Sequence, residues 1–415
     1  MAKIDSLGSA NDKPYVVYHV LDTLLNAGFE AYLVGGCVRD KLLGLTPGDY
    51  DVATNALPDQ VQSLFPHTVP TGIQHGTVSV LEDGERIEVT TFRREGVYKD
   101  ARRPSEVRFD ASLQEDLARR DFTINAMAQD RFGNLFDPFG GQSDLEQQII
   151  RAVGDPSARF QEDALRMLRA VRFSAVLGFQ IESETWRSII QHAPIIGRIA
   201  RERIRDEWNK MVCADLSLGV DQLIRSGLFS FIFGSILSRT KEEWLRAAQF
   251  ADRLPKKLDL RHAALLLGTD VRLVQKWMNQ IRQPKRLTRS VVAILEAMPD
   301  SNPLRWSPFD WRQFLYQHGQ HAAEQAILIY SQMIPVDADK LIAVCLASIE
   351  DQPIWSLADL AVTGHDILKH TGRRPGPWLG PLLNQLAQLV LTNPNLNRSQ
   401  ELKHAAEHFL QKGSL

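Results

Sequence analysis

The chain has 415 residues, of which 44% are hydrophobic and 24% charged, and its formal net charge is -2. This length predicts two to four domains, and the near-average composition excludes disordered, collagenous and coiled-coil classes. Three widely spaced cysteines, Cys37, Cys213 and Cys345, fit neither a disulfide framework nor a thiolate metal site. With no run of about 18 apolar residues, we expect a cytoplasmic protein without a membrane partner.

Strand-like and helix-like segments alternate up to about residue 140. YLVGG, YDVAT, TVSVLE and RIEVTTF are short runs rich in β-branched and aromatic residues, separated by turn signals such as EDGE. Beyond about residue 150 helical periodicity dominates, as in FQEDALRMLRAVRFSAVLGF and KEEWLRAAQFADRL. The sequence therefore predicts an N-terminal α/β or α+β domain followed by almost wholly helical domains.

The segment YLVGGCVRDKLLG predicts a strand, a tight turn at Gly35 and Gly36, and a helix beginning near Cys37. Glycines let backbone amides approach a ligand closely, and Arg39, one turn into the helix, offers a guanidinium to a phosphate. A strand-to-helix corner without any ligand explains this motif equally well when it is taken alone.

Two aspartates are candidate metal ligands, and one glutamate is a candidate member of the same carboxylate cluster. In GDYDVAT, Asp49 and Asp51 are two residues apart, so they point to the same side of an extended strand. Adjacent carboxylates repel each other unless a cation lies between them, and Mg²⁺ is usually held by one or two carboxylates together with phosphate oxygens. Glu88 in RIEVTTF is a candidate third carboxylate. A solvated turn explains DxD alone, but the nearby glycine turn favours a nucleotide site.

The segment FQEDALRMLRAVRF predicts an amphipathic helix with one apolar and one charged arc. The apolar arc comprises Ala164, Met167, Leu168, Val171 and Ala175, and the charged arc comprises Asp163, Arg166, Arg169 and Arg172. Closely spaced arginines repel one another without anions, and an arginine beside a carboxylate can match the hydrogen-bonding edge of a base. The charged arc is therefore a candidate site, and a plain exposed helix is the alternative.

The same two interpretations, a candidate site or a solvated helix, hold for the triplet Arg119, Arg120 and Asp121 in DLARRDFTINAMA.

In this order, LVGGCVRD, GDYDVAT, IEVTTFR, RRPSEVRF, DLARRDFTINAMA and EDALRMLRAVRF resemble the motifs of class II tRNA nucleotidyltransferases, the CCA-adding enzymes of the polymerase-beta superfamily. The tail segment GRRPGPWLGPLL is similar to that of the bacterial, Gram-positive type. The resemblance implies an α+β polymerase-beta-like nucleotidyltransferase head with a mixed, five-stranded catalytic sheet, then all-α neck, body and tail in a seahorse shape. Its implied boundaries are 1–150 for the catalytic head, 151–210 for the neck with the base template, and 211–300 and 301–415 for a tRNA-binding body and tail.

The resemblance also implies roles for individual residues. Asp49 and Asp51 are the implied Mg²⁺ ligands, and Glu88 is assigned as the third catalytic carboxylate on its strand context alone. Asp163 and Arg166 are the implied protein template for the incoming base. The further implied nucleotide contacts are Gly35, Gly36, Arg39, Arg120, Arg169 and Arg172.

The implied activity is the template-independent addition of C, C and A to the 3′ end of tRNA. CTP and ATP are the implied substrates, and the chemistry is Mg²⁺-dependent two-metal nucleotidyl transfer that releases pyrophosphate. We expect the protein to hold tRNA by its 3′ end and its acceptor and T arm, and we expect no protein partner.

Three alternatives belong to other functional classes or subclasses. A bacterial poly(A) polymerase is disfavoured because EDALR resembles the CCA-adding template and the chain carries no long basic C-terminal extension. A CC-only enzyme is disfavoured because RREGVYKDARRPSEVRF is not shortened. A non-enzymatic RNA-binding module is disfavoured because Asp49 and Asp51 are both present.

We also expect the charged segment RREGVYKDARRPSEVRF to be mobile and to reposition the template before the final A is added.

Overall fold

The computed structural model describes residues 13–96, 107–234, 239–334 and 337–411. The chain folds as two compact units, Met1–Lys241 and Glu242–Leu415. Most of the charged segment expected to reposition the template, residues 97–106, lies outside the described residues. In the described part of the chain, no helix has the length and apolar character needed to cross a membrane.

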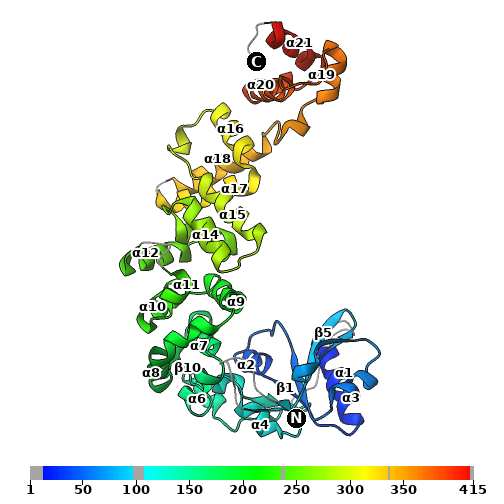
Figure 1. The fold of residues 1–415 in the computed structure, drawn as a ribbon, viewed down its shortest axis with the longest axis vertical. Helices are drawn as coiled ribbons and strands as arrows, with labels where there is room; N and C mark the ends of the chain where they lie inside the picture. The colour runs from blue at the N-terminus through cyan, green and yellow to red at the C-terminus, as the bar shows by residue number, and fades with distance from the viewer. Residues whose placement is uncertain (1–12, 97–106, 235–238, 335–336, 412–415) are drawn as a thin grey trace. The chain divides into compact units, whose positions relative to one another are not determined.

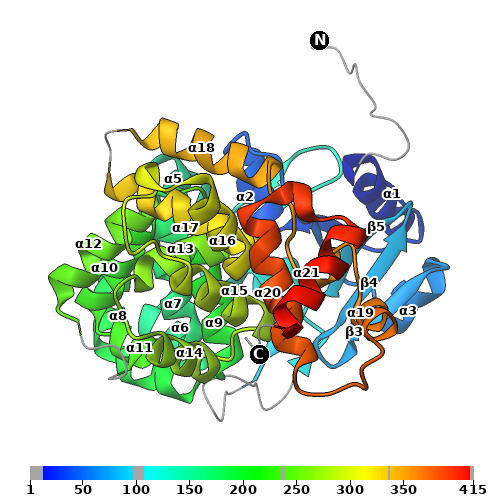
Figure 2. The same cartoon turned by 90° about the horizontal axis from the view of Figure 1, so that it is seen from above.

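A seven-stranded mixed sheet organises the N-terminal part of the first unit, with strand order β3-β4-β5-β2-β1-β8-β9. The strands are β1 (Ala31–Val34), β2 (Asp51–Thr54), β3 (Thr68–Gly72), β4 (Thr77–Glu82), β5 (Glu85–Thr91), β8 (Ala128–Gln129) and β9 (Leu135–Phe136). Strands β2 and β5 run parallel, and the other neighbours are antiparallel. Figure 2 shows β5, β4 and β3 side by side. The mixed α+β head is confirmed; it has two strands more than expected because the short β8–β9 hairpin extends the sheet beyond β1.

Helices cover both faces of this sheet. Helices α1 (Lys13–Asn26) and α3 (Pro58–Leu64) pack together against one face, which Figure 1 shows beside β5. On the opposite face, α4 (Leu113–Ala118) places Leu117 in a buried cluster with Val34 and Ala53. Because side chains two residues apart in a strand share a face, Asp51 projects from the same face as Ala53.

Among its described residues, the rest of the first unit is mostly helical and adds two very short strand pairs. The helices are α2 (Gly36–Leu42), α5 (Gly141–Glu146), α6 (Pro156–Glu162), α7 (Leu165–Leu177), α8 (Ser183–His192), α9 (Arg201–Val212), α10 (Leu216–Ser226) and α11 (Phe229–Phe233). Strands β10 (Ile149–Ile150) and β11 (Gln180–Ile181) pair in parallel, and β6 (Arg94–Glu95) and β7 (Val107–Arg108) pair antiparallel. Helix α7 packs against both α9 and α10, which confirms the expected change to helical structure near residue 150.

The expectation of a single amphipathic helix across FQEDALRMLRAVRF is wrong in one respect, because the segment forms two helices. Helix α6 ends at Glu162, and Asp163 is extended, with φ -141° and ψ 102°. The Asp163 carboxylate accepts a hydrogen bond from the backbone N–H of Leu165 at 3.1 Å, so it marks the beginning of α7 instead of continuing α6. The apolar arc is confirmed as core, since all five of its members are buried: Ala164, Met167, Leu168, Val171 and Ala175.

The described residues of the second unit form helices joined by loops, with no strand among them. Its helices are α12 (Lys241–Asp252), α13 (Leu258–Leu266), α14 (Val271–Gln280), α15 (Lys285–Glu296), α16 (Pro308–His318), α17 (Gln320–Met333), α18 (Ala338–Glu350), α19 (Gly364–Thr371), α20 (Leu379–Thr392) and α21 (Ser399–Gln411). Its C-terminal helices share a core in which Leu382, Leu386 and Leu402 are fully buried. These apolar positions recur at helical spacing, which is why the sequence pattern predicted helices here.

Candidate active site

A cavity of about 450 Å³ in the first unit gathers residues from β2, α2, α7 and α9 and from the segments that follow β1, α4 and α6. Its lining contains nine sequence-predicted site residues: Gly35, Gly36, Arg39, Asp51, Arg120, Asp163, Arg166, Arg169 and Arg172. The remaining lining residues are Arg119, Asp121, Asn125, Leu165, Phe173 and Arg203. Asp49 and Glu88 are not part of this lining. Residues scattered over about 170 positions of sequence therefore meet at one place.

The glycine turn forms one edge of the cavity, as the sequence predicts. Gly35 has a left-handed φ of 74°, a conformation that L side chains rarely adopt. A Cβ atom at Gly35 would lie 2.8 Å from Nη1 of Arg120, whereas one at Gly36 would meet its nearest neighbour, Nη2 of Arg39, at 3.6 Å. The absence of a side chain at Gly35 therefore lets the Arg120 guanidinium lie directly against the backbone.

The candidate metal ligands occupy two different local structures. Asp51 opens β2 and is the register partner of Glu88 on the parallel strand β5, so the two side chains share one face of the sheet. Asp49 lies in a bend at residues 48–49, before the strand, and is exposed. The expectation that Asp49 and Asp51 lie in one extended strand is therefore wrong, because the chain turns before it enters β2.

The electrostatics around Asp51 fit a divalent cation. Burial raises the pKa of the Asp51 carboxyl to about 6; the Arg120 guanidinium opposes this rise, and the negative charges of Glu88 and Asp49 add to it. A cation beside these carboxylates would relieve their repulsion and favour the ionised form of Asp51. Within the described ranges, no group of three His, Cys, Asp or Glu residues meets the geometry of a metal site. Two carboxylates still fit Mg²⁺, which commonly takes its other ligands from phosphate and water.

Asp116 holds the two arginines of the charged triplet. Its carboxyl, only 1% exposed, accepts hydrogen bonds from Nε and Nη2 of Arg119 at 2.9 and 2.7 Å and from Nη2 of Arg120 at 3.2 Å. Nε of Arg120 is buried and has no hydrogen-bond partner among the residues that the structure describes. Arg120 is therefore fixed through Nη2, while the residue lines the cavity.

Two further carboxylates orient the arginines of α7. Asp121 accepts a hydrogen bond from Nε of Arg169 at 2.7 Å, and Glu207 accepts one from Nε of Arg172 at 2.8 Å. The ring of Phe173 lies 3.5 Å from the Arg172 guanidinium carbon, with Arg169 at 5.4 Å. Arg172 is only 8% exposed, so the alternative of a plain solvated arginine helix is wrong.

The two residues expected to form the base template have separate partners. Arg166 donates hydrogen bonds from Nη1 to Glu162 at 2.5 Å and from Nη2 to the backbone carbonyl of Arg119 at 2.6 Å. Asp163 accepts from Nη1 and Nη2 of Arg203 at 3.1 and 2.7 Å. Both side chains line the cavity, each held by a neighbour that fixes its orientation.

The sequence did not place Asp116, Asn125, Phe173 or Arg203 at the nucleotide site. Asn125 accepts a hydrogen bond from Nη1 of Arg39 at 2.7 Å, although the two residues are 86 positions apart. A sequence signal existed only for Phe173, which follows Arg172 directly in the charged helix. The pairing of Arg203 with Asp163 spans 40 positions and two helices, and no local pattern indicates it.

A mixed-sheet head that presents carboxylates beside an arginine-lined cavity defines the protein as a nucleotidyltransferase. Residues 31–151 match the family model described as the poly A polymerase head domain. Residues 178–238 match the model "Probable RNA and SrmB-binding site of polymerase A", and residues 260–406 match a model for tRNA nucleotidyltransferase domain 2.

Full-length relatives narrow this class to one family. The chain is 38% identical to the CCA-adding enzyme of Anoxybacillus flavithermus, over 93% of this chain and 95% of the relative. It is 39% identical to that of a Geobacillus species, over 90% and 91%. The crystal structure of the Bacillus stearothermophilus CCA-adding enzyme in complex with CTP superposes with a TM-score of 0.83 at 31% identity, covering 97% of this chain and 99% of that one. The chain belongs to the family of CCA-adding enzymes.

Proposed function

We propose that the protein adds C, C and A to the 3′ end of tRNA, using CTP and ATP and no nucleic-acid template, and releases pyrophosphate. The observation that carries this proposal is the single cavity that contains both Asp51 and the pair Asp163 and Arg166. The CTP bound to the Bacillus stearothermophilus relative supports a cytidine nucleotide as one substrate.

Asp163 and Arg166 supply the chemistry for choosing a base. Cytosine and adenine each present an exocyclic amino donor beside a ring-nitrogen acceptor, whereas uracil and guanine present the opposite order on the same edge. A carboxylate can accept from the amino group while a guanidinium donates to the ring nitrogen. Asp163 and Arg166 would therefore accept C and A and reject U and G. Asp163 can do this while it stays paired with Arg203, because each carboxylate oxygen carries more than one acceptor position.

The carboxylates and arginines divide the remaining work between them. Asp49 and Asp51 would hold Mg²⁺, with Glu88 beside Asp51, and the metal would lower the pKa of the tRNA 3′-hydroxyl and neutralise the triphosphate and the leaving pyrophosphate. The guanidinium groups of Arg39, Arg120 and Arg169 supply positive charge along the same cavity for the nucleotide phosphates. Gly35 and Gly36 allow the nucleotide to approach the backbone.

The helical parts supply the RNA-binding surfaces in this proposal. We retain the division into a head (1–150), a neck (151–210), a body (211–300) and a tail (301–415), with tRNA held by the body and tail. The matches of residues 178–238 and 260–406 to models of polymerase RNA-binding and tRNA nucleotidyltransferase regions support this assignment. Since tRNA, CTP and ATP are the substrates, we assign the reaction to the cytoplasm.

The decisive experiment is incubation of the purified protein with tRNA that ends before CCA. CTP alone should add two nucleotides, and CTP with ATP should add three and then stop, as read from product length on a gel. Long adenylate tails from ATP would instead identify a poly(A) polymerase. Arrest after two C residues in the presence of ATP would identify a CC-only enzyme, and no addition at all would contradict the proposal.

A further inference from the structure

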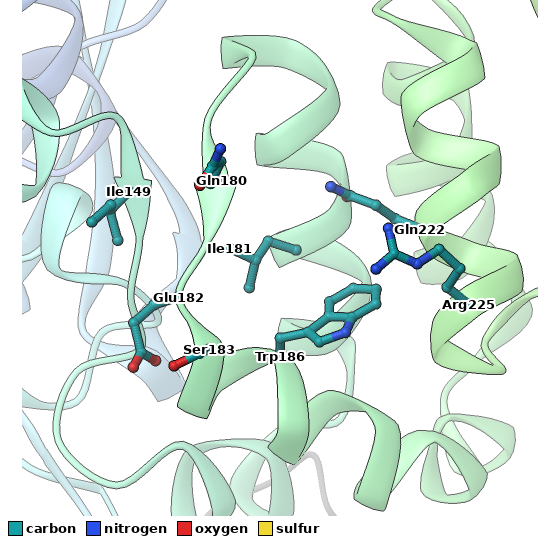
Figure 3. Close-up of a pocket in the computed structure, with 8 residues that line it drawn as sticks. All are labelled: Ile149, Gln180, Ile181, Glu182, Ser183, Trp186, Gln222 and Arg225. Carbon is teal, nitrogen blue, oxygen red and sulfur yellow. The ribbon is translucent and has the colours of Figure 1, made fainter.

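A second cavity of about 660 Å³ lies in the first unit and shares no lining residue with the candidate active site. It is lined by Ile149, Gln180, Ile181, Glu182, Ser183, Trp186, Gln222 and Arg225. These residues come from β10, β11, the beginning of α8, and α10. Figure 3 shows Trp186 between Ile181 and Arg225, with Gln222 extending from α10 toward β11. We call this space the Trp186 cavity.

An indole and a guanidinium form one side of the Trp186 cavity. The guanidinium carbon of Arg225 lies 5.6 Å from the centroid of the Trp186 ring. The Arg225 side chain is 64% exposed and is tethered by Asp221, the Nη1 to Oδ2 distance being 3.3 Å. A planar group that enters the cavity thus meets an aromatic surface and a flat, largely exposed cation, a combination that favours stacking.

Gln222 contributes a hydrogen-bond acceptor whose orientation is fixed by its neighbours. The Ser174 hydroxyl donates to the backbone carbonyl of Phe179 at 2.6 Å, so it accepts the hydrogen bond from Nε2 of Gln222 at 2.7 Å. Oε1 of Gln222 is consequently turned away from Ser174, and it is buried without a hydrogen-bond partner among the described residues. Because Oε1 has almost no solvent-accessible surface, a ligand in the cavity reaches it only when the Gln222 side chain shifts; such a shift would let a donor on the ligand recover the free energy that an unpaired buried acceptor costs.

The charges around the Trp186 cavity nearly balance. Glu182 accepts a hydrogen bond from the backbone N–H of Thr185 at 2.7 Å and lies 3.7 Å from Nη1 of Arg151. Asp221 neutralises Arg225. No uncompensated cation cluster is therefore available to bind a triphosphate, and the cavity suits the neutral, flat part of a nucleotide better than its phosphates.

We propose that the Trp186 cavity binds one unpaired nucleobase of an RNA chain, outside the active site. Stacking on Trp186 would supply affinity, and the Gln222 acceptor would receive a hydrogen bond from the edge of the base. All lining residues except Ile149 lie within 178–238, the segment that matches the polymerase RNA-binding model. The inference rests on the proposed function, because it takes the RNA substrate as the source of the base.

The test measures RNA binding by the full chain without any nucleotide addition. A fluorescently labelled, unstructured RNA 12-mer is titrated with the parent protein, Trp186→Ala, Trp186→Phe and Arg225→Ala. The matched control is Arg187→Ala, which removes an exposed arginine of α8 that is not part of the cavity lining. We expect Trp186→Ala to weaken RNA binding about tenfold, since stacking on one aromatic residue is worth about 1–3 kcal/mol per base. Trp186→Phe should retain most of the RNA affinity of the parent protein. Arg187→Ala should change the RNA affinity less than Arg225→Ala does.

Photocrosslinking gives a second measurement that does not depend on a folded variant. RNA containing 4-thiouridine is irradiated with the parent protein, and the crosslinked peptide is identified by mass spectrometry. A crosslink within residues 180–186 or 222–225 is expected. Unchanged RNA affinity in Trp186→Ala, together with crosslinks elsewhere, would overturn the inference. It would also be overturned if free AMP or CMP bound more tightly than the RNA in a manner that depends on Trp186. Failure of the proposed function would be recognised separately, as absence of nucleotide addition by the parent protein.

Discussion

The guanidinium of Arg203 in α9 binds both carboxylate oxygens of Asp163, at 3.1 and 2.7 Å, at the junction between α6 and α7. Asp163 is thereby held at the edge of the cavity in an extended conformation. A two-point arginine–carboxylate pair fixes orientation as well as position. Arg203 is therefore a positioning residue for the proposed base template, although it lies far from Asp163 in sequence.

We expect Arg203→Ala to relax the choice of base. Asp163→Ala and Arg166→Ala should each raise incorporation of UTP and GTP relative to CTP and ATP, by about tenfold or more, since a good two-point base contact is worth about 1–3 kcal/mol. Arg203→Ala should shift selectivity in the same direction but less. The measurement is single-nucleotide incorporation with each triphosphate in turn. Slower addition with unchanged selectivity in all three variants would leave this charged group only a general role in binding anions.

Asp51→Asn should lower the rate of nucleotide addition by about a thousandfold or more, because it removes a charged ligand for the proposed metal. Affinity for tRNA should stay near that of the parent, and circular dichroism should match. Glu88→Gln tests the third carboxylate; Glu85→Gln is its control, since Glu85 is on the same strand but three residues away and hence on the opposite face. Equal rates for the two glutamate variants would remove Glu88 from the catalytic group.

Gly35→Ala and Gly36→Ala form a matched pair at the glycine turn. At Gly35 a methyl group meets both a left-handed φ and the Arg120 guanidinium, whereas at Gly36 it meets only ordinary van der Waals contact. We expect Gly35→Ala to lower the free energy of unfolding by about 1–3 kcal/mol and to slow addition at least tenfold. Gly36→Ala should be milder in a chemical denaturation and in the same rate assay. The reverse order of effects would show that Gly36, and not Gly35, is the position that requires glycine.

His262 should make the stability of the second unit depend on pH. Burial lowers the pKa of its imidazole from 6.5 to about 4, although the hydrogen bond to the Leu258 carbonyl and the charge of Asp259 oppose this shift. Between those two pH values the unfolded chain binds a proton that the folded unit does not, so stability is full above about pH 6.5 and falls as the pH drops toward 4. The loss should be on the order of 3 kcal/mol.

Hydrogen exchange of the α13 amides at pH 7 and pH 4.5 measures this loss. His262→Gln should reduce the difference between the two pH values, whereas His404→Gln, at an exposed position in α21, should leave it unchanged. The same pH dependence in the His262→Gln protein would assign the effect to other groups.

Local sequence patterns predicted the elements and most of the candidate site. The alternation around YDVAT and RIEVTTF predicted β2 and β5, and the glycine pair predicted the turn after β1, because strand periodicity and glycine conformation depend on neighbouring residues alone. The charged arc of FQEDALRMLRAVRF identified four lining residues of the cavity for the same reason. The helix break at Asp163 was missed because α6 and α7 both favour helix locally, and the extended residue between them is held by Arg203 from another helix.

By itself, therefore, the sequence determined the α+β head, the helical remainder and the residue types of the proposed metal-dependent nucleotide site. Only the tertiary structure decided which of these residues meet. It made Glu88 the neighbour of Asp51 through the parallel register of β5 with β2, and it buried Asp116 beneath Arg119 and Arg120. The physical reason is that strand register and ion pairing between distant segments depend on how whole elements pack, which the spacing of residues along the chain does not encode.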